Sequence, residues 1–322
     1  MQLERYGKKT KGMMLDMCYI MPEGIINVYK PKGMTSFDVI AVLRKILRMR
    51  KIGHTGTLDK EVEGVLPVCV GTATGAVPFL TVKDKVYQCE MQFGVVTDTQ
   101  DAYGAVIAAQ EIEDIRLHET QLRKIVSGFV GEYMQIPPMY SAKKVNGERL
   151  YNIARQGGEV ERKPVQVQIL YIRDIAFLDE SRISFVVKCS KGTYIRTLCH
   201  DIGSAYGTGA HMTELKRIQS GTFHIADAVC LEEIQAHVDA GTIGEIMTPV
   251  EQALVQFPKL ELGAEELRLY QNGMTVRFDC DAEAELYRVY DQESGVFIGV
   301  GERRENGFIK TKKFFCKRET SK

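Results

Sequence analysis

The sequence lacks the patterns that mark metal sites and nucleotide cofactors. Its eight cysteines contain no C-x-x-C pair, and its six histidines form neither H-E-x-x-H nor H-x-E spacing. A Walker loop and a G-x-G-x-x-G fingerprint are also missing. Scattered cysteines in apolar sequence pack as small hydrophobic side chains. We therefore expect no metal, no disulfide and no cofactor.

A net charge is missing as well, because 42 lysines and arginines balance 42 aspartates and glutamates. This balance argues mildly against nucleic-acid binding, since phosphate contacts need cations. The charges are nevertheless unevenly distributed, with acids concentrated between Asp227 and Glu293. Each of two basic clusters fits either an RNA contact or a solvated helix face. They comprise Arg44, Lys45, Arg48, Arg50 and Lys51, and then Lys143, Lys144, Arg149, Arg155, Arg162 and Lys163.

No apolar run approaches the length of a membrane span. The N-terminal stretch from Met13 to Met21 is interrupted by Asp16 and lacks a convincing cleavage site. We therefore interpret residues 1–23 as an N-terminal extension and expect the protein to stay in the cytoplasm, with no membrane contact.

The hydrophobic periodicity predicts helices and strands in mixed order. Thr35 or Ser36 can cap a helix, because apolar residues then recur at helical spacing from Val39 to Leu47. Strict alternation from Tyr87 to Phe93, repeated at 165–171 and 183–189, predicts half-buried strands. This mixture indicates an α+β domain on a mainly antiparallel sheet.

Two later segments differ in character from the rest. Residues 135–164 are polar, basic and rich in proline and glycine, which favours a protruding insert. Past about Phe257, short strands alternate with the turns Glu293–Gly295 and Glu305–Gly307, which is typical of hairpins. We thus expect a main domain over 24–255 and a small β-rich C-terminal domain over 256–322.

The glycine-rich turn Gly53–Asp59 presents one carboxylate just before the apolar run 65–70. A buried strand there would hold the turn rigidly, as a preorganised site requires. On spacing alone, Asp59 is more simply explained as a turn cap that binds its own backbone amides.

The surrounding motifs change this interpretation, because together they resemble the TruB family of tRNA pseudouridine synthases. The matching segments follow family order over about residues 24–221. They are Lys30–Ser36, Gly53–Asp59, Gly64–Cys69, Thr97–Asp101, Gln135–Ala142 and Cys189–Thr197. The resemblance implies a mainly antiparallel pseudouridine-synthase sheet, a thumb at about 135–164 and a PUA-like RNA-binding domain at the C-terminus. It also implies conversion of uridine 55 in the tRNA T loop to pseudouridine, without cofactor.

By the same resemblance, Asp59 is the catalytic carboxylate and Arg196 its ion-pair partner. Tyr87 would stack on the extruded target base and handle a proton, although periodicity alone favours a core position. Tyr194 and Leu215 would form the pocket wall.

Four further residues are implied as substrate contacts. His54 would lie near the space that the flipped nucleotide vacates. Lys30 would pack beside the active site in support, and Lys143 and Lys144 would belong to the thumb. The implied partner is the T-arm stem-loop of tRNA, and we expect a monomer with no obligate protein partner.

Several positions depart from the family pattern. Lys60 and Val62 replace a usual proline and alanine beside Asp59, Phe37 replaces a common polar residue, and Gly75 replaces a frequent lysine. If Lys60 points toward the pocket, it can support Asp59 ionisation or compete with Arg196 for the carboxylate. We expect it to face solvent instead, because an unpaired buried ammonium is costly. The alternatives are a catalytically weak or silent tRNA-binding protein of the same fold, and a synthase for another RNA.

Overall fold

The computed structural model describes most of the chain, and the predicted N-terminal extension lies outside this part except for Glu23. Only the backbone is described for 144–145, 148–149 and 306. The described residues are 23–141, 144–145, 148–149, 153, 158, 160–278 and 284–316.

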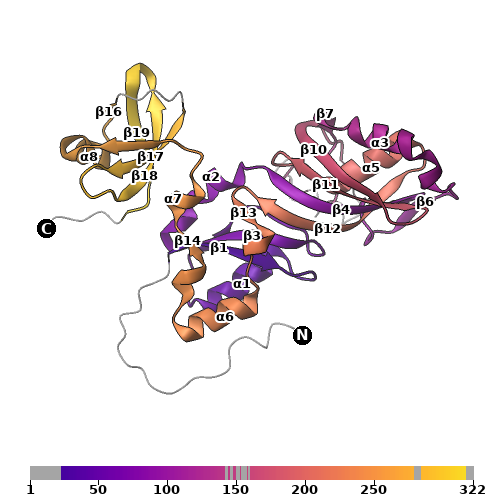
Figure 1. Ribbon diagram of the computed structural model, residues 1–322, viewed down its shortest axis with the longest axis horizontal. Helices are drawn as coiled ribbons and strands as arrows, with labels where there is room; N and C mark the ends of the chain where they lie inside the picture. The colour runs from indigo at the N-terminus through magenta and orange to yellow at the C-terminus, as the bar shows by residue number, and fades with distance from the viewer. Residues whose placement is uncertain are drawn as a thin grey trace.

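A ten-stranded sheet runs through the larger part of the molecule (Figure 1). Its main path has the order β14-β1-β3-β12-β4-β11-β10-β7, with β2 pairing β3 and β13 pairing β12. Among the described strands of this sheet, β3 and β12 form the parallel pair and the others pair antiparallel. The strands are β1 (Gly24–Lys30), β2 (Ile52–His54), β3 (Glu63–Val70), β4 (Lys85–Phe93), β7 (Gly131–Gln135), β10 (Val165–Phe177), β11 (Arg182–Cys189), β12 (Ala210–Ser220), β13 (Phe223–His224) and β14 (Met247–Thr248).

Helices cover the sheet in two groups, each over its own apolar core. One core lies between β1, β3 and helices α1 and α6, and the other between β4, β11 and helices α3 and α5. The α-helices are α1 (Ser36–Ile46), α2 (Val77–Thr81), α3 (Glu119–Ser127), α5 (Ile195–Tyr206), α6 (Leu231–Ala240), α7 (Val250–Ala253) and α8 (Ala264–Gln271). The 3₁₀ turns are η1 (Gly71–Ala76), η2 (Ile115–His118), η3 (Ile225–Asp227), η4 (Ile243–Ile246) and η5 (Glu305–Gly307).

The predicted first helix is confirmed. Thr35 caps α1, and its hydroxyl accepts a hydrogen bond from the Asp38 amide while the Asp38 carboxylate bonds back to Thr35. This reciprocal capping satisfies amides that would otherwise lack partners at the helix start. The apolar stripe from Val39 to Leu47 is buried against the sheet.

The C-terminal domain is a separate five-stranded sheet, as the hairpin pattern predicts. Its order is β15-β17-β18-β19-β16, and Gly295 and Gly307 adopt the positive φ values that these turns require. Figure 1 shows it at one end of the molecule, beside α2 and α7. The strands are β15 (Lys259–Leu262), β16 (Val276–Arg277), β17 (Leu286–Asp291), β18 (Phe297–Arg304) and β19 (Phe308–Phe314).

Side-chain packing joins this domain to the large sheet. Val300 and Phe315 belong to the same apolar cluster as Ile25 and Val65. At Gly75, which stands where the family often has lysine, a Cβ atom would overlap Lys313 Cε and lie 3.3 Å from Phe315 Cε1, both from the C-terminal domain. The predicted fold class, α+β with a mainly antiparallel sheet and a β-rich C-terminal domain, is confirmed.

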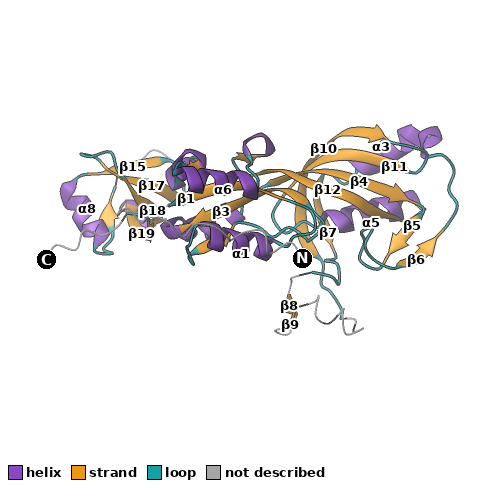
Figure 2. Cartoon of the chain, turned by 90° about the horizontal axis from the view of Figure 1, so that it is seen from below, coloured by secondary structure: helices purple, strands orange, loops and turns teal. Residues whose placement is uncertain are grey.

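Two short hairpins lie off these sheets. β5 (Val95–Thr97) pairs with β6 (Val106–Ala109), and β8 (Lys144–Val145) pairs with β9 (Glu148–Arg149). Figure 2 shows β8 and β9 standing away from the main body, within the segment predicted to form the thumb. No helix in the described ranges has the length and apolar character to cross a membrane.

Candidate active site

The loop that carries Asp59 is fastened by the segment that joins β1 to α1. The Ser36 hydroxyl accepts a hydrogen bond from the Leu58 amide at 2.9 Å and donates to the Leu58 carbonyl at 3.3 Å. On the other side of Asp59, the Lys60 carbonyl accepts from the Gly33 amide at 3.0 Å. These contacts hold the backbone on both sides of the carboxylate.

Lys30 strengthens this attachment from inside the protein. Its fully buried ammonium donates to the carbonyls of Lys60 at 3.2 Å, Pro31 at 2.9 Å and Met34 at 2.5 Å. Burial lowers the Lys30 pKa to about 8, against the opposing charges of Glu61 and Asp59. Lys30 is thus placed as a positioning residue for the loop, and a direct contact with substrate stays a prediction.

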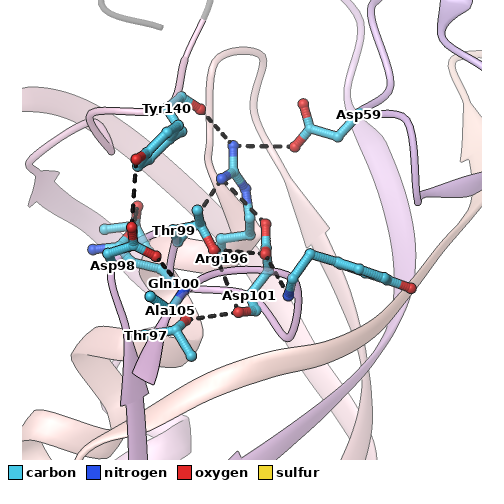
Figure 3. Close-up of polar contacts among 11 residues, drawn as sticks. Asp59, Thr97, Asp98, Thr99, Gln100, Asp101, Ala105, Tyr140 and Arg196 are labelled. Atoms are coloured by element: carbon cyan, nitrogen blue, oxygen red, sulfur yellow. Dashed lines mark hydrogen bonds and ion pairs between the residues drawn. The ribbon is translucent and has the colours of Figure 1, made fainter. Parts of the chain in front are cut away.

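Arg196, in the first turn of α5, holds the Asp59 carboxylate (Figure 3). Its Nη2 lies 3.1 Å from Asp59 Oδ2, and the two side chains are 7% and 58% exposed. The guanidinium also donates to the carbonyls of Thr99 at 2.9 Å and Tyr140 at 2.8 Å. Backbone carbonyls therefore fix the arginine, while the carboxylate extends from it toward solvent.

Asp101 is a second carboxylate on the same guanidinium, and the sequence did not single it out. Its Oδ2 lies 3.3 Å from Arg196 Nη1, and its Oδ1 accepts from the Thr99 hydroxyl at 2.7 Å and the Tyr103 amide at 3.0 Å. The only sequence signal was membership of the segment Thr97–Asp101, because nothing in the spacing connects residue 101 to residue 196.

A cavity of about 250 Å³ opens beside Asp59 and brings most of the predicted site together. Tyr87, Tyr194, Arg196 and Leu215 line it along with Asp59. A second cavity of about 530 Å³ shares Asp59, Arg196 and Leu215. Residues from four distant segments therefore meet around one carboxylate.

Tyr87 and Arg217 meet on the inner side of the smaller cavity. Burial raises the pKa of the Tyr87 phenol, while the charge and hydrogen bond of Arg217 act in the opposite direction. Arg217 was also missed by the sequence reasoning, since a bulge in β12 at this residue breaks the strand alternation. Gly64 accommodates the arginine, because a Cβ on this positive-φ residue would overlap the Arg217 backbone.

Tyr194 and His54 are positioned in different ways. Tyr194 caps α5, and the Gln135 side chain bonds both its amide, at 2.8 Å, and its carbonyl, at 3.0 Å. His54 lies on β2, outside the described lining of both cavities, with its ring edge-on to Phe37 at 5.8 Å between centroids. Burial lowers the His54 pKa, so the ring is neutral at physiological pH.

The lysine beside Asp59 faces solvent, as expected. The Lys60 side chain is 62% exposed and its Nζ lies 3.9 Å from Glu61 Oε1. Of the thumb lysines, Lys143 lies outside the described residues and Lys144 is described by its backbone in β8 alone. Their contacts with substrate stay predictions.

Comparison with known proteins gives family matches along most of the chain. Residues 44–195 match the model of the TruB family pseudouridylate synthase N-terminal domain. Residues 196–255 match the tRNA pseudouridylate synthase B C-terminal domain, and 258–315 match the pseudouridine synthase II TruB C-terminal model. The tRNA pseudouridine synthase B of Clostridium perfringens is 43% identical, covering 88% of this chain and 96% of that protein.

The chain belongs to the TruB family of pseudouridine synthases. The tRNA pseudouridine synthase B of Lactiplantibacillus plantarum is 42% identical, covering 84% of this chain and 92% of that protein. Among solved structures, a Cbf5-Nop10-Gar1 complex matches with a TM-score of 0.72 and 25% identity, covering 92% of this chain and 86% of that one. The archaeal box H/ACA sRNP Nop10-Cbf5 complex gives a TM-score of 0.68 and 26% identity, with coverages of 93% and 88%.

The described residues of this TruB-family chain contain no group of three or more His, Cys, Asp or Glu side chains that could hold a metal ion. The polar groups that line the cavity with Asp59 include instead the guanidinium groups of Arg196 and Arg217, the Lys85 ammonium and the phenols of Tyr87 and Tyr194. Such a site can bind an uncharged base and stabilise charge that develops during bond cleavage.

Proposed function

We propose that this chain converts uridine 55 in the T loop of tRNA to pseudouridine, with Asp59 as the catalytic carboxylate. The observation that carries this proposal is the Asp59–Arg196 pair, 3.1 Å apart at the mouth of a cavity lined by Tyr87 and Leu215. Family membership and the printed names of the curated relatives support the choice of tRNA. A tRNA substrate also supports the predicted cytoplasmic location.

The reaction exchanges one bond between uracil and ribose for another. When the C1′–N1 bond breaks, its electron pair leaves with uracil as the N1 anion. The Asp59 carboxylate balances the positive ribose, either by bonding to C1′ or by taking the 2′ proton. After uracil turns, C5 bonds to C1′. In the first case the carboxylate leaves C1′, and in the second the protonated Asp59 returns its proton to C2′. C5 then loses a proton and N1 gains one, so the reaction is redox-neutral.

The cavity supports a mechanism in which the target nucleotide is flipped out of the RNA. Tyr87 offers an aromatic face for stacking, and its buried phenol stays protonated at neutral pH. Leu215 belongs to the linings of both cavities, so a base held in either one would lie near it. The β8–β9 hairpin and the C-terminal domain, which we propose to be PUA-like, would hold the surrounding T arm.

Mapping of pseudouridine in an unmodified tRNA transcript tests the proposal directly. Purified protein is incubated with the transcript, and pseudouridine is located by carbodiimide-dependent primer extension. We expect one stop that maps to uridine 55 and grows with time. RNA binding without any stop would instead show the silent tRNA-binding alternative, and a stop only in another RNA would show a different substrate.

The silent alternative depended mainly on the possibility that Lys60 spoils the site. An exposed Lys60 whose ammonium lies beside Glu61 does not compete for the Arg196 guanidinium. The retained Asp59–Arg196 pair therefore favours the enzyme over the silent protein.

A further inference from the structure

Besides Arg196, two further buried cations line the cavity that contains Asp59. Lys85, at the start of β4, is 6% exposed, and Arg217, on β12, is 1% exposed. They converge on one backbone position, because a Cβ built on Gly56 would lie 3.5 Å from Arg217 Nη1 and 3.8 Å from Lys85 Cε. The cavity proposed to hold an uncharged base thus has two buried positive groups in its wall in addition to Arg196.

Backbone carbonyls hold both cations in place. Lys85 Nζ donates to the carbonyls of Thr81, at 2.7 Å, and Lys83. Arg217 donates through Nε to Val65, at 2.7 Å, and through Nη2 to Gly56, at 3.1 Å. Neither cation forms an ion pair with any carboxylate in the part of the chain that the structure describes.

Burying these two cations without a carboxylate partner costs folding free energy. Burial and, to a smaller extent, the positive charge of Arg217 lower the Lys85 pKa to about 8. An uncompensated buried charge destabilises a fold, and two cations near one another also repel. Carbonyl oxygens offset part of this cost, but a negative ligand in the cavity would offset much more of it.

The negative species that the proposed reaction creates here is uracil itself. During C1′–N1 cleavage the electron pair moves onto N1 and spreads by resonance to O2 and O4. We propose that Lys85 and Arg217 bind this departing uracil anion through its carbonyl oxygens and hold it while it turns to present C5. This inference rests on the proposed function and assigns two further catalytic residues to it.

The two cations would then act mainly in the transition state. Neutral uracil in the bound substrate gains little from them, whereas the developing anion gains a strong interaction in a site shielded from water. Asp59 on the ribose side and the cations on the base side would stabilise opposite charges of one breaking bond. A cation pair that simply bound an RNA phosphate would instead strengthen substrate binding and its salt dependence.

A leaving-group comparison tests the proposal. The substrate is a synthetic T-arm stem-loop with either uridine or 5-fluorouridine at the target position. Fluorine withdraws electrons and stabilises the uracil anion without altering O2 or O4. The consumption of the target nucleoside is followed by nuclease digestion and chromatography under single-turnover conditions.

For Lys85→Met we expect the rate on uridine to fall about a hundredfold, which is typical of losing one preorganised group that stabilises developing negative charge. The loss of rate on 5-fluorouridine should be clearly smaller, because fluorine already stabilises the departing 5-fluorouracil anion. Lys85→Arg should recover part of the rate. Lys85→Gln, whose amide can still donate to both carbonyls, replaces Lys85→Met if the latter fails to fold.

The matched control is Lys188→Met, which removes a lysine on β11 next to Cys189, the residue that pairs with Lys85 across the sheet. Lys188 pairs with Asp84 at 3.6 Å outside the cavity, so both rates should stay near those of the parent protein. Equal loss on both substrates, or a loss of RNA affinity alone, would overturn the proposal. A parent protein without activity on uridine would instead refute the proposed function.

Discussion

Arg196 and Asp59 form an ion pair at 3.1 Å in which the arginine is buried and the aspartate is mostly exposed. The guanidinium has two backbone carbonyls and a second carboxylate around it, so its position does not depend on Asp59. The Asp59 side chain is therefore the exposed member of the pair, and Arg196 is the fixed member. A carboxylate in this position can leave its partner to react and then return to it.

The Asp59→Asn substitution should abolish pseudouridine formation. The amide keeps the shape of the side chain but cannot act as a nucleophile or base, so tRNA affinity should stay within about tenfold of the parent value. Primer extension measures the product and filter binding measures affinity. Substantial turnover by a protein free of host synthase would remove Asp59 from the mechanism.

The Asp101→Asn substitution should slow the chemical step without weakening tRNA binding. With Asp101 neutral, Arg196 loses one of its two carboxylate partners and can shift, together with Asp59. We expect the single-turnover rate to fall by about a hundredfold, because small displacements of catalytic groups have effects of this size. Asp114→Asn is the matched control, since Asp114 pairs with Arg116 at 2.6 Å and does not contact Arg196. An unchanged rate for Asp101→Asn would show that the carbonyls alone position the arginine.

Replacement of Lys60 should have little effect. The Lys60 carbonyl accepts a hydrogen bond from the Lys30 ammonium, and a proline at this position retains that carbonyl. The Lys60 side chain itself is 62% exposed. We expect the single-turnover rates of Lys60→Pro and Lys60→Met to stay within about twofold of the parent, as for surface substitutions generally. A loss of about a hundredfold in both, with RNA binding intact, would place this lysine in the mechanism.

Alanine at Lys143, Lys144 and Arg149 should weaken tRNA binding and flatten its salt dependence. Each lost phosphate contact lowers the slope of log affinity against log salt by about one unit. Single alanine substitution of Lys124, which is exposed on α3, controls for the general loss of charge. An affinity and salt slope equal to those of the parent would make this basic tract a solvated surface.

Lys30 should give the stability a characteristic pH dependence. Its pKa is about 8 in the folded protein and 10.5 in the unfolded chain, so between these values the unfolded chain binds more protons. Stability from this group therefore rises as pH increases from about 8 to 10.5. The free energy of unfolding of the parent minus that of Lys30→Met should rise over this range, as chemical denaturation can measure. A constant difference would show that the Lys30 pKa is not lowered by burial.

The fold prediction depended on local sequence patterns. The strict alternation of Tyr87–Phe93, the helical stripe after Thr35 and the glycine turns at 295 and 307 each depend on neighbouring residues, and all three were confirmed. The site prediction went further only through family resemblance. On spacing alone Asp59 was a turn cap, because a short motif does not reveal what lies opposite it.

The amino-acid sequence by itself determined the class of fold, several of its strands and helices, and the family. Only the tertiary structure decided which groups surround Asp59. Asp101 and Arg217 lie far along the chain from it, and Lys85 lies on β4, which β12 separates from β3 in the sheet. Their roles depend on strand pairing, on the bulge at Arg217 and on backbone carbonyls that hold the cations. The burial of these residues and the arrangement of their charges depend on contacts between distant parts of the chain. Hydrophobic periodicity along the chain does not encode such contacts.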